Sequence, residues 1–556
     1  HAASDDPPLV VLGESGVGKS ALLANWAMRY RDAHPEALLL MHFIGATPYS
    51  ADWAAMLRRI MGEFKRQFRL EGEIPDRPDA LRLAFANWLH MAAARGRVVL
   101  ILDALNQLED REGALDLVWL PPVIPANVRL ILSTLPGKPL QELRKRGWPT
   151  LQVEPLQLEE RRLLTRAYLE QYTKTLTRPQ TERIASAPQT ANPLYLRALL
   201  EELRVYGDHA TLDRRIDYYL AANTVADLYK RILQRYEEDY ERERPGLVRE
   251  AMSLLWAARR GLSEAELLEL LGTNGEPLPR AHWSPLYLVA EPSLVSRAGL
   301  IGFFHDYLRQ AVQDRYLPSA REWQAAHLRL ADYFASRDLG PRKVDELPWQ
   351  LAQAESWERL YALLADLAFF KAIWEADQFE VKAYWTHVET HSPLRLVNAY
   401  QPVLDAPARY ADYVSCFGNI AVLLRDTGHP DQAVSLLTYL AEHYRQIGDQ
   451  AKLQAILTDV VGLSIDRGGD LGEAMALLKE QEQICRQLED KGLLAASLNL
   501  QGKLFVIQGR LDEAMSLFEQ VEGIFRELGN KIGVAKSLNN QAGILHSRGD
   551  LEGTMS

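Results

Sequence analysis

The first part of the chain alternates short apolar runs with longer segments whose apolar residues recur at helical spacing. This alternation is typical of a parallel β-sheet that is wrapped by helices. We therefore expect an α/β domain over residues 1–156. The longer segments predict helices, notably over residues 19–30, 51–70 and 77–94. The apolar runs predict strands over residues 9–12, 38–44, 98–102, 128–133 and 151–153.

Strand signals nearly vanish after this domain, and helical periodicity dominates. The exception is a β-rich stretch over residues 286–304, which follows two predicted helices. The second of these helices opens with a capping box formed by Ser263 and Glu266. The order helix, helix, hairpin, helix suggests a winged helix. The region is therefore divided into a helical lid over 157–244, a winged-helix domain over 245–320 and a helical linker domain over 321–409.

The sequence repeats itself over residues 410–556. Gly428, Gly469, Gly509 and Gly549 are spaced by 41, 40 and 40 residues, and an alanine follows each of the first three after five residues. A period of this length is typical of helical hairpins that stack into an α-solenoid, as tetratricopeptide-like repeats do. The alternative is an ordinary helical bundle in which the matches are coincidental.

The composition mainly excludes some classes of partner and of location. The 556 residues carry a net charge of −11, and no apolar run approaches the roughly 18 residues of a membrane-spanning helix. We expect no membrane anchor, and nucleic acid is an unlikely partner, because an acidic chain does not attract a polyanion. Glu264, Glu266 and Glu269 also occupy the helix that would enter a DNA groove. The two cysteines, Cys416 and Cys485, lie in apolar helical patterns and fit a reducing cytoplasm.

The strongest chemical signal is the motif G-x-x-x-x-G-K-S, which directly follows the first predicted strand. In such a phosphate-binding loop the glycines let backbone N–H groups surround the phosphates, the lysine reaches the β- and γ-phosphates, and the serine ligates Mg²⁺. The positive end of the next helix supports anion binding. The alternative is a glycine-rich turn with a surface lysine. The motif predicts that ATP or ADP contacts Gly13, Ser15, Gly16, Val17, Gly18, Lys19, Ser20 and Ala21.

A second acidic element fits the same chemistry. Asp103 ends the apolar run over residues 98–102, which comes after the phosphate-binding loop in the chain. An aspartate at the carboxyl end of a buried strand can hold the water shell of Mg²⁺ beside Ser20. We therefore assign Ser20 and Asp103 to the metal, and Lys19 and Asp103 to catalysis. The alternative is an aspartate that only caps the following turn.

Together these motifs resemble the NACHT branch of the STAND signalling ATPases, in particular nephrocystin-like members with tetratricopeptide repeats. The resemblance rests on the phosphate-binding loop, on residues 42–47, 100–110 and 130–136, and on residues 191–196. It implies a switch that ADP holds as a closed monomer and that ATP lets assemble into an active homo-oligomer. It also implies that the repeats sense a protein or peptide trigger. In prokaryotes it further implies innate immunity or stress signalling.

The resemblance implies nucleotide contacts outside the loop. Pro193 is expected to begin a lid helix and to pack against adenine, although proline is also common at a plain helix start. His305 is expected to contact the β-phosphate of ADP, and the alternative is a structural histidine at a helix start. Leu135 stands where many relatives place an arginine that senses the γ-phosphate, which leaves the Thr134 hydroxyl as the remaining candidate.

One departure from the family pattern concerns hydrolysis. Asn106 and Gln107 stand where relatives carry two acids. An amide cannot accept a proton from an attacking water, so hydrolysis is expected to be slow unless Glu109 or Asp110 takes part.

Three functions fit the sequence. The first is an ATP/ADP-gated signalling switch, in which the loop, lid, winged helix and repeats form one device. The second is a turnover ATPase, which would require an acidic base near Asp103. The third is a scaffold with a structural nucleotide and partner-binding repeats. The switch explains more of the chain than the other two, and a change of oligomeric state between ADP and ATP would separate it from the scaffold.

The chain begins without Met and stops partway through a repeat, so we also expect it to be a piece of a longer polypeptide.

Overall fold

The computed structural model describes residues 7–46, 50–75, 77–110, 113–466 and 471–547. By its internal contacts the chain forms two compact units, His1–Leu330 and Ala331–Ser556. The first unit holds both β-sheets, and the described part of the second is helical.

The larger sheet contains five parallel strands in the order β2-β3-β4-β1-β5. Every residue of β3 and β4 is buried, which explains why the sequence of these central strands is almost continuously apolar. The edge strand β5 is exposed throughout. The strands are β1 (Leu9–Leu12), β2 (Leu38–Phe43), β3 (Val98–Asp103), β4 (Val128–Ser133) and β5 (Thr150–Gln152), within one or two residues of the predicted bounds.

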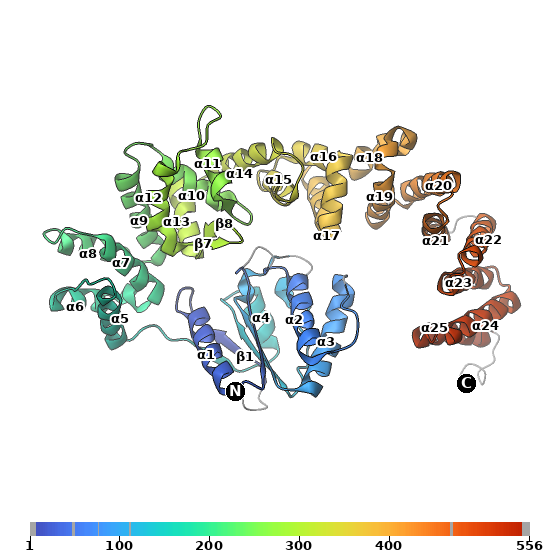
Figure 1. Cartoon of the computed structure of the whole chain (residues 1–556), viewed down its shortest axis with the longest axis horizontal. Coiled ribbons are helices and arrows are strands. Elements are labelled where there is room, and N and C mark those ends of the chain that lie inside the picture. Colours follow the sequence, from blue (N-terminus) through green and yellow to red (C-terminus); the bar gives the residue numbers. More distant parts are fainter. Residues whose placement is uncertain (1–6, 47–49, 76, 111–112, 467–470, 548–556) are drawn as a thin grey trace. The chain divides into compact units, whose positions relative to one another are not determined.

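Helices cover both faces of this sheet (Figure 1). On one face α1 (Lys19–Ala33) packs Leu23 and Ala27 against β1, β3 and β4. On the other face α2 (Trp53–Phe68) and α3 (Pro78–Arg95) form a larger core together with α4 (Lys138–Lys145). The predicted α/β fold of this region is therefore confirmed.

A helical segment follows, and a buried ion pair lies inside it. Arg235 donates two hydrogen bonds to the Glu202 carboxylate, at 2.7 and 2.9 Å, and the Tyr219 hydroxyl donates to the same carboxylate at 2.6 Å. A buried carboxylate with this many donors is satisfied and adds specificity to the helix packing. The helices are α5 (Leu158–Glu170), α6 (Arg178–Ser186), α7 (Pro193–Val205), α8 (Leu212–Leu220) and α9 (Val225–Tyr240).

The next segment has the arrangement of a winged helix. Three helices precede an antiparallel hairpin, whose strands join β6 in a small sheet of order β6-β8-β7. The elements are α10 (Leu247–Ala257), β6 (Leu262–Ser263), α11 (Glu264–Leu271), α12 (Arg280–Ala290), β7 (Leu294–Arg297), β8 (Leu300–Phe303) and α13 (Asp306–Tyr316). The predicted capping box at the start of α11 is present.

The helix α12 corrects two expectations. Residues 286–290 were predicted to be β-rich, but they are helical because Trp283, Leu286 and Ala290 fall on one buried face at helical spacing. The helix that precedes the hairpin, where a winged helix would enter a DNA groove, is therefore α12 and not α11. Because α12 carries no acidic side chain, the argument from the glutamates of α11 against DNA is wrong. Only the net negative charge of the chain now supports the expectation of no nucleic-acid partner.

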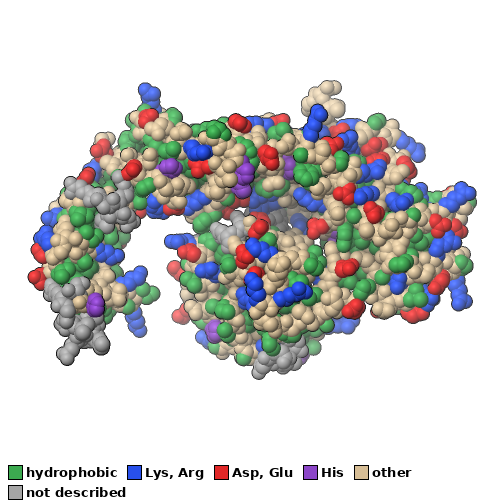
Figure 2. Space-filling view, turned by 180° about the vertical axis from the view of Figure 1, so that it is seen from behind, with side chains coloured by type: hydrophobic (Ala, Val, Ile, Leu, Met, Phe, Trp, Pro, Cys, Tyr) green, Lys and Arg blue, Asp and Glu red, His purple; other side chains and the backbone are tan. Residues whose placement is uncertain are grey.

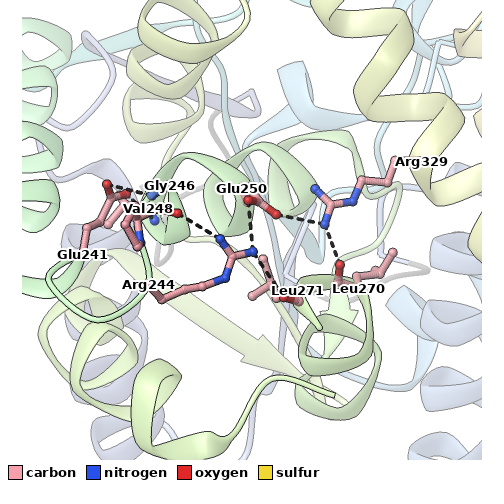
Figure 3. A network of polar contacts seen from close by, with 9 residues as sticks. Glu241, Arg244, Gly246, Val248, Glu250, Leu270, Leu271 and Arg329 are labelled. Carbon is pink, nitrogen blue, oxygen red and sulfur yellow. Dashed lines mark hydrogen bonds and ion pairs between the residues drawn. The ribbon is translucent and has the colours of Figure 1, made fainter. Parts of the chain in front are cut away.

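A polar network fastens α14 (Ala320–Ala335) to the winged helix (Figure 3). The Glu250 carboxylate of α10 accepts hydrogen bonds from Arg244 at 3.1 Å and from Arg329 of α14 at 3.0 Å. The same two guanidinium groups donate to the carbonyls of Leu271 and Leu270, at the end of α11. The network therefore joins three helices around one carboxylate.

The second unit begins at Ala331, within α14, and continues as a series of helices that includes the repeats. Its first helices are α15 (Pro341–Gln353), α16 (Trp357–Ala365), α17 (Leu367–His391) and α18 (Leu396–Asp405). The repeats follow as α19 (Val414–Asp426), α20 (Pro430–Ile447), α21 (Gln450–Asp466), α22 (Leu471–Gln487), α23 (Lys491–Ile507), α24 (Leu511–Glu527) and α25 (Lys531–Ser547). The predicted helical solenoid is confirmed. Gly469 and residues 549–554 of the repeat motif lie outside the described residues.

Small residues allow close helix packing inside the repeats. Ala433, Ala474 and Ala514 are at most 2% exposed, as their position in the motif predicts. Gly502 of α23 is a second such site, because a Cβ atom there would lie 2.6 Å from the buried ring of Phe518. The preceding repeat carries Gly462 at the same position, and no atom lies within 4 Å of the place of its Cβ. It has a leucine, Leu478, in place of the phenylalanine.

Charged side chains of both signs are interspersed on the face that Figure 2 shows. Among the residues that the structure describes, no helix combines the length and the apolar character needed to cross a membrane.

Gly502→Ala is expected to destabilise the repeats, because the new methyl group meets a ring that cannot move away. Overpacking of this kind costs about 1–3 kcal/mol. Gly462→Ala is the matched control, and in an uncrowded helix position it should stabilise by about 0.5–1 kcal/mol. The measurement is the urea midpoint of the full chain followed by circular dichroism. Shifts of both variants in the same direction would contradict this account of the packing.

Candidate functional site

The phosphate-binding loop lies between β1 and α1, and its shape requires glycine. Gly13, Gly16 and Gly18 have φ angles of +153°, +77° and +99°. A Cβ atom on Gly13 would lie 2.7 Å from Val17, and one on Gly16 would lie 2.8 Å from the Leu194 side chain. The first two glycines therefore serve close packing as well as the turn.

The third glycine faces open space. No atom lies within 4 Å of where a Cβ atom of Gly18 would be, and the following Ser20 and Ala21 are exposed. Gly18 is the N-cap of α1 and supplies no side-chain cap, so the first N–H groups of α1 have no capping partner from this residue. Free N–H groups at the positive end of a helix favour an anion. The residues present therefore fit a bound phosphate.

Lys19 is held at the edge of the loop. Its ammonium group donates to the carbonyls of Gly13 at 2.7 Å and Glu14 at 2.9 Å, and the side chain is largely buried. Burial lowers the pKa of Lys19, and the nearby Asp103 carboxylate acts in the opposite direction. The charges of Lys19 and Asp103 therefore act on each other.

The carboxylate of Asp103 is fixed at the carboxyl end of β3. The Ser133 hydroxyl, at the end of the neighbouring strand β4, donates to it. The Ala104 N–H donates in turn to the Ser133 oxygen at 2.9 Å. This chain of hydrogen bonds orients Asp103, which is only 3% exposed. The sequence analysis missed the role of Ser133, since nothing local indicates which side chain lies beside a strand end.

The segment after Asp103 is anchored by its amides. It forms a short 3₁₀ turn, η1 (Leu105–Gln107), and the Asn106 side chain accepts a hydrogen bond from the Leu135 N–H at 3.2 Å. Thr134 is fully buried, and its hydroxyl donates to the Leu135 carbonyl at 3.1 Å. A contact of Thr134 with a phosphate would therefore require this hydroxyl to turn. Asn106 has a structural contact that the sequence did not indicate.

The start of α7 lies directly on the loop. The Asn192 side-chain NH₂ donates to the Ser15 carbonyl at 3.1 Å, and the Leu194 N–H donates to the Gly16 carbonyl at 3.3 Å. Pro193 is the first residue of α7 and stands between these two contacts. The structure therefore places Pro193, which the sequence analysis predicted, beside the loop. It also places Asn192 there. The only sequence signal for Asn192 was its position just before an expected helix start, where asparagine is a preferred N-cap.

The winged helix reaches the same loop. The Tyr307 hydroxyl of α13 donates to the Ser15 carbonyl at 3.4 Å. His305 precedes α13 as its N-cap without a side-chain capping bond. Elsewhere in this unit Arg297 of β7 donates to the carbonyl of Gly45, in the turn that follows β2. Sequence reasoning predicted His305 and missed Tyr307, which lies two residues away from it.

One imidazole, that of His305, and one carboxylate, that of Glu109, have defined surroundings. Burial, and secondly the positive charge of Arg197, lowers the pKa of His305 to about 4. His305 is therefore neutral at pH 7 and can donate one hydrogen bond as an uncharged imidazole. The carboxylate of Glu109, one of the two candidates for a general base, lies 3.8 Å from the guanidinium group of Arg260.

Comparisons with known proteins found one matching family model and several sequence relatives. Residues 1–132 match the family model described as AAA ATPase domain. The chain is 33% identical over 425 residues to the TPR repeat-containing protein DDB_G0287407 of Dictyostelium discoideum, covering 69% of this chain and 25% of that protein. It is 26% identical over 399 residues to mouse (Mus musculus) nephrocystin-3, covering 69% and 29%. The chain thus spans between a quarter and a third of the length of these relatives.

One solved structure is similar along nearly the whole chain. It is that of the STAND protein with a tetratricopeptide repeat sensor, PH0952, from Pyrococcus horikoshii, with 15% identity and a TM-score of 0.43, covering 99% of this chain and 79% of that one. The two sequence relatives confirm the resemblance to nephrocystin-like proteins with tetratricopeptide repeats.

The low pKa of His305 predicts a pH dependence of stability. Between its ordinary value of 6.5 and about 4, the unfolded chain binds a proton at His305 that the folded chain does not. The folded state therefore loses stability as the pH falls through this window, by at most about 1.4 kcal/mol per pH unit. His305→Leu should make the urea midpoint depend less steeply on pH between 7 and 5. His90→Leu, on the exposed face of α3, is the control. Parallel curves for wild type and His305→Leu would contradict the assignment.

Proposed function

We propose that this chain is an ATP/ADP-gated signalling switch that oligomerises on activation. The observation that carries the proposal is the contact of two downstream segments with one phosphate-binding loop. The lid reaches the loop through Asn192 and Leu194, and the winged helix reaches it through Tyr307. A nucleotide that changes the loop must therefore act on both segments, which is what a conformational switch requires.

The nucleotide would be held mainly by backbone groups. In this proposal the phosphates lie against the loop and the start of α1, with Lys19 as the main cationic contact. Ser20 and Asp103 would hold Mg²⁺, which when bound supplies charge neutralisation at the phosphate oxygens. Pro193 would face the adenine, because it begins the helix that lies on the loop. The residues proposed to contact ATP or ADP are Gly13, Ser15, Gly16, Val17, Gly18, Lys19, Ser20, Ala21, Pro193 and His305.

Slow hydrolysis is part of the proposal. Lys19 and Asp103 are the residues assigned to catalysis, but Asp103 already accepts a hydrogen bond from Ser133 and is nearly inaccessible. Asn106 cannot act as a base, and its amide is engaged with Leu135. Glu109 faces Arg260 at 3.8 Å. A site built this way favours holding a nucleotide over rapid turnover.

His305 would sense bound ADP through a hydrogen bond to a phosphate oxygen. It lies two residues from Tyr307 at the start of α13, and as a neutral imidazole it can donate one hydrogen bond to a phosphate oxygen. A hydrogen bond to a charged group contributes about 1.5–3 kcal/mol, enough to shift a two-state equilibrium by about ten- to a hundredfold.

The remaining parts of the proposal concern partners and location. We propose that the active form is a homo-oligomer, that the repeats bind a protein or peptide trigger, and that the protein works in the cytoplasm. Stacked helical repeats present an extended surface suited to such binding. A role in defence or stress signalling rests on the family resemblance alone.

The test of the switch compares oligomeric states. Light scattering during size-exclusion chromatography of the full chain should show a monomer with MgADP and a larger assembly with a non-hydrolysable ATP analogue and Mg²⁺. Lys19→Ala, which removes the main cationic contact, should give the same profile with both nucleotides. Identical profiles for wild type in ADP and in the ATP analogue would favour a scaffold with a structural nucleotide instead.

Asp103→Asn should separate metal binding from loop binding. Without the carboxylate, Mg²⁺-dependent affinity should fall more for ATP than for ADP, by about tenfold or more, because the γ-phosphate depends most on the metal. Calorimetric titration with and without Mg²⁺ measures this difference. Asp116→Asn is the control, since Asp116 is a partly exposed residue that pairs with Lys138 at 2.9 Å. Equal losses for ATP and ADP would argue against the metal role.

A further inference from the structure

We propose that Asn192 and Tyr307 are positioning residues that together set the direction of one peptide unit of the phosphate-binding loop. Both donate to the same atom, the Ser15 carbonyl oxygen, but they belong to different segments, the lid and the winged helix. Through this shared acceptor the two segments would control nucleotide release jointly. This inference rests on the proposed nucleotide site and names how that site is regulated.

The geometry allows both contacts at once. A carbonyl oxygen has two lone pairs and can accept two hydrogen bonds. Asn192 contributes one at 3.1 Å and Tyr307 the other at 3.4 Å. The donors are separated from Ser15 by 177 and 292 residues along the chain. One carbonyl oxygen is therefore contacted by both downstream segments.

The orientation of the Asn192 side chain is fixed by its own helix. Its amide oxygen accepts from the N–H groups of Leu194 at 2.9 Å and Tyr195 at 3.3 Å, as an N-cap does. The NH₂ group therefore has to point the other way, toward Ser15. An aspartate at this position would keep the cap but would present an acceptor to the Ser15 carbonyl. Asparagine is thus needed for the loop contact and not for the helix.

Tyr307 is suited to donate at any physiological pH. Burial raises the pKa of its phenol, so the hydroxyl keeps its proton. The side chain is only partly exposed, and the bond to Ser15 involves nothing but the hydroxyl. Removing that oxygen therefore tests the contact without creating a cavity.

The peptide bond transmits the effect to the phosphates. In a planar trans peptide the C=O and the N–H point in opposite directions. Holding the Ser15 carbonyl toward the lid therefore fixes the direction of the Gly16 N–H, one of the donors assigned to the nucleotide. The Gly16 carbonyl is also held, by the Leu194 N–H at 3.3 Å. Because Gly16 has a φ of +77° and glycine is flexible, this peptide would otherwise rotate easily.

The experiment measures release of a fluorescent ADP analogue from the full chain in the presence of Mg²⁺. Asn192→Asp and Tyr307→Phe should each raise the dissociation rate, by about three- to tenfold, as expected for the loss of one hydrogen bond. The double variant should release the analogue more slowly than the product of the two single effects predicts, because both substitutions act on one peptide unit. Hydrogen exchange of the peptide that spans the loop should rise in the same variants.

Two matched controls remove comparable hydrogen bonds elsewhere in the first unit. Asn127→Asp removes the donor to the Ala93 carbonyl before β4, and Tyr218→Phe removes the hydroxyl that donates to Gln234. Neither should change release of the analogue. Unfolding midpoints of all four variants should stay close to wild type, which separates positioning from general loss of structure.

The outcomes distinguish this inference from the proposed function. If wild type binds the analogue but Asn192→Asp and Tyr307→Phe release it at the wild-type rate, the positioning role is wrong and the nucleotide site stands. If wild type does not bind the analogue, both proposals fail. Strict multiplicativity of the two single effects would overturn the shared-acceptor argument.

Discussion

The central constraint on this structure is how the carbonyls of the phosphate-binding loop are satisfied. A loop that turns its N–H groups toward an anion must turn carbonyls away from it, and each needs a donor. The Lys19 ammonium serves the carbonyls of Gly13 and Glu14. The next two, those of Ser15 and Gly16, are served from outside the α/β fold by α7 and α13. The carbonyls of Ser15 and Gly16 therefore have these donors only when the lid and the winged helix are in place.

This arrangement links local chemistry to the rest of the first unit. The winged helix has further contacts with the α/β fold, from Arg297 to the Gly45 carbonyl and from Arg260 to Glu109. The carboxylate of Glu250 also connects α10 to Arg329 of α14, the helix within which the first unit ends (Figure 3). Within the first unit, these contacts connect the α/β fold to the winged helix and the winged helix to Arg329 of α14.

Sequence patterns predicted most of the fold because the decisive signals are local. Buried strands, the glycine positions of the loop and the 40-residue period each depend on neighbouring residues, and the strands and the solenoid were found close to their observed bounds. The helix α12 was missed because an apolar run of that length fits a strand or a buried helix equally. Ser133, Asn192 and Tyr307 were missed because their partners are distant in the chain. Such contacts follow from the packing of whole segments, which no local pattern encodes.

The central claim is that the loop binds an adenine nucleotide through a surface completed by the lid and the winged helix. Isothermal titration calorimetry of the full chain, stripped of co-purified nucleotide, tests it most directly. The account predicts one MgADP bound per chain, with loss of that binding when the loop lysine is removed. Absence of binding to wild type by any adenine nucleotide under magnesium-replete conditions would contradict it.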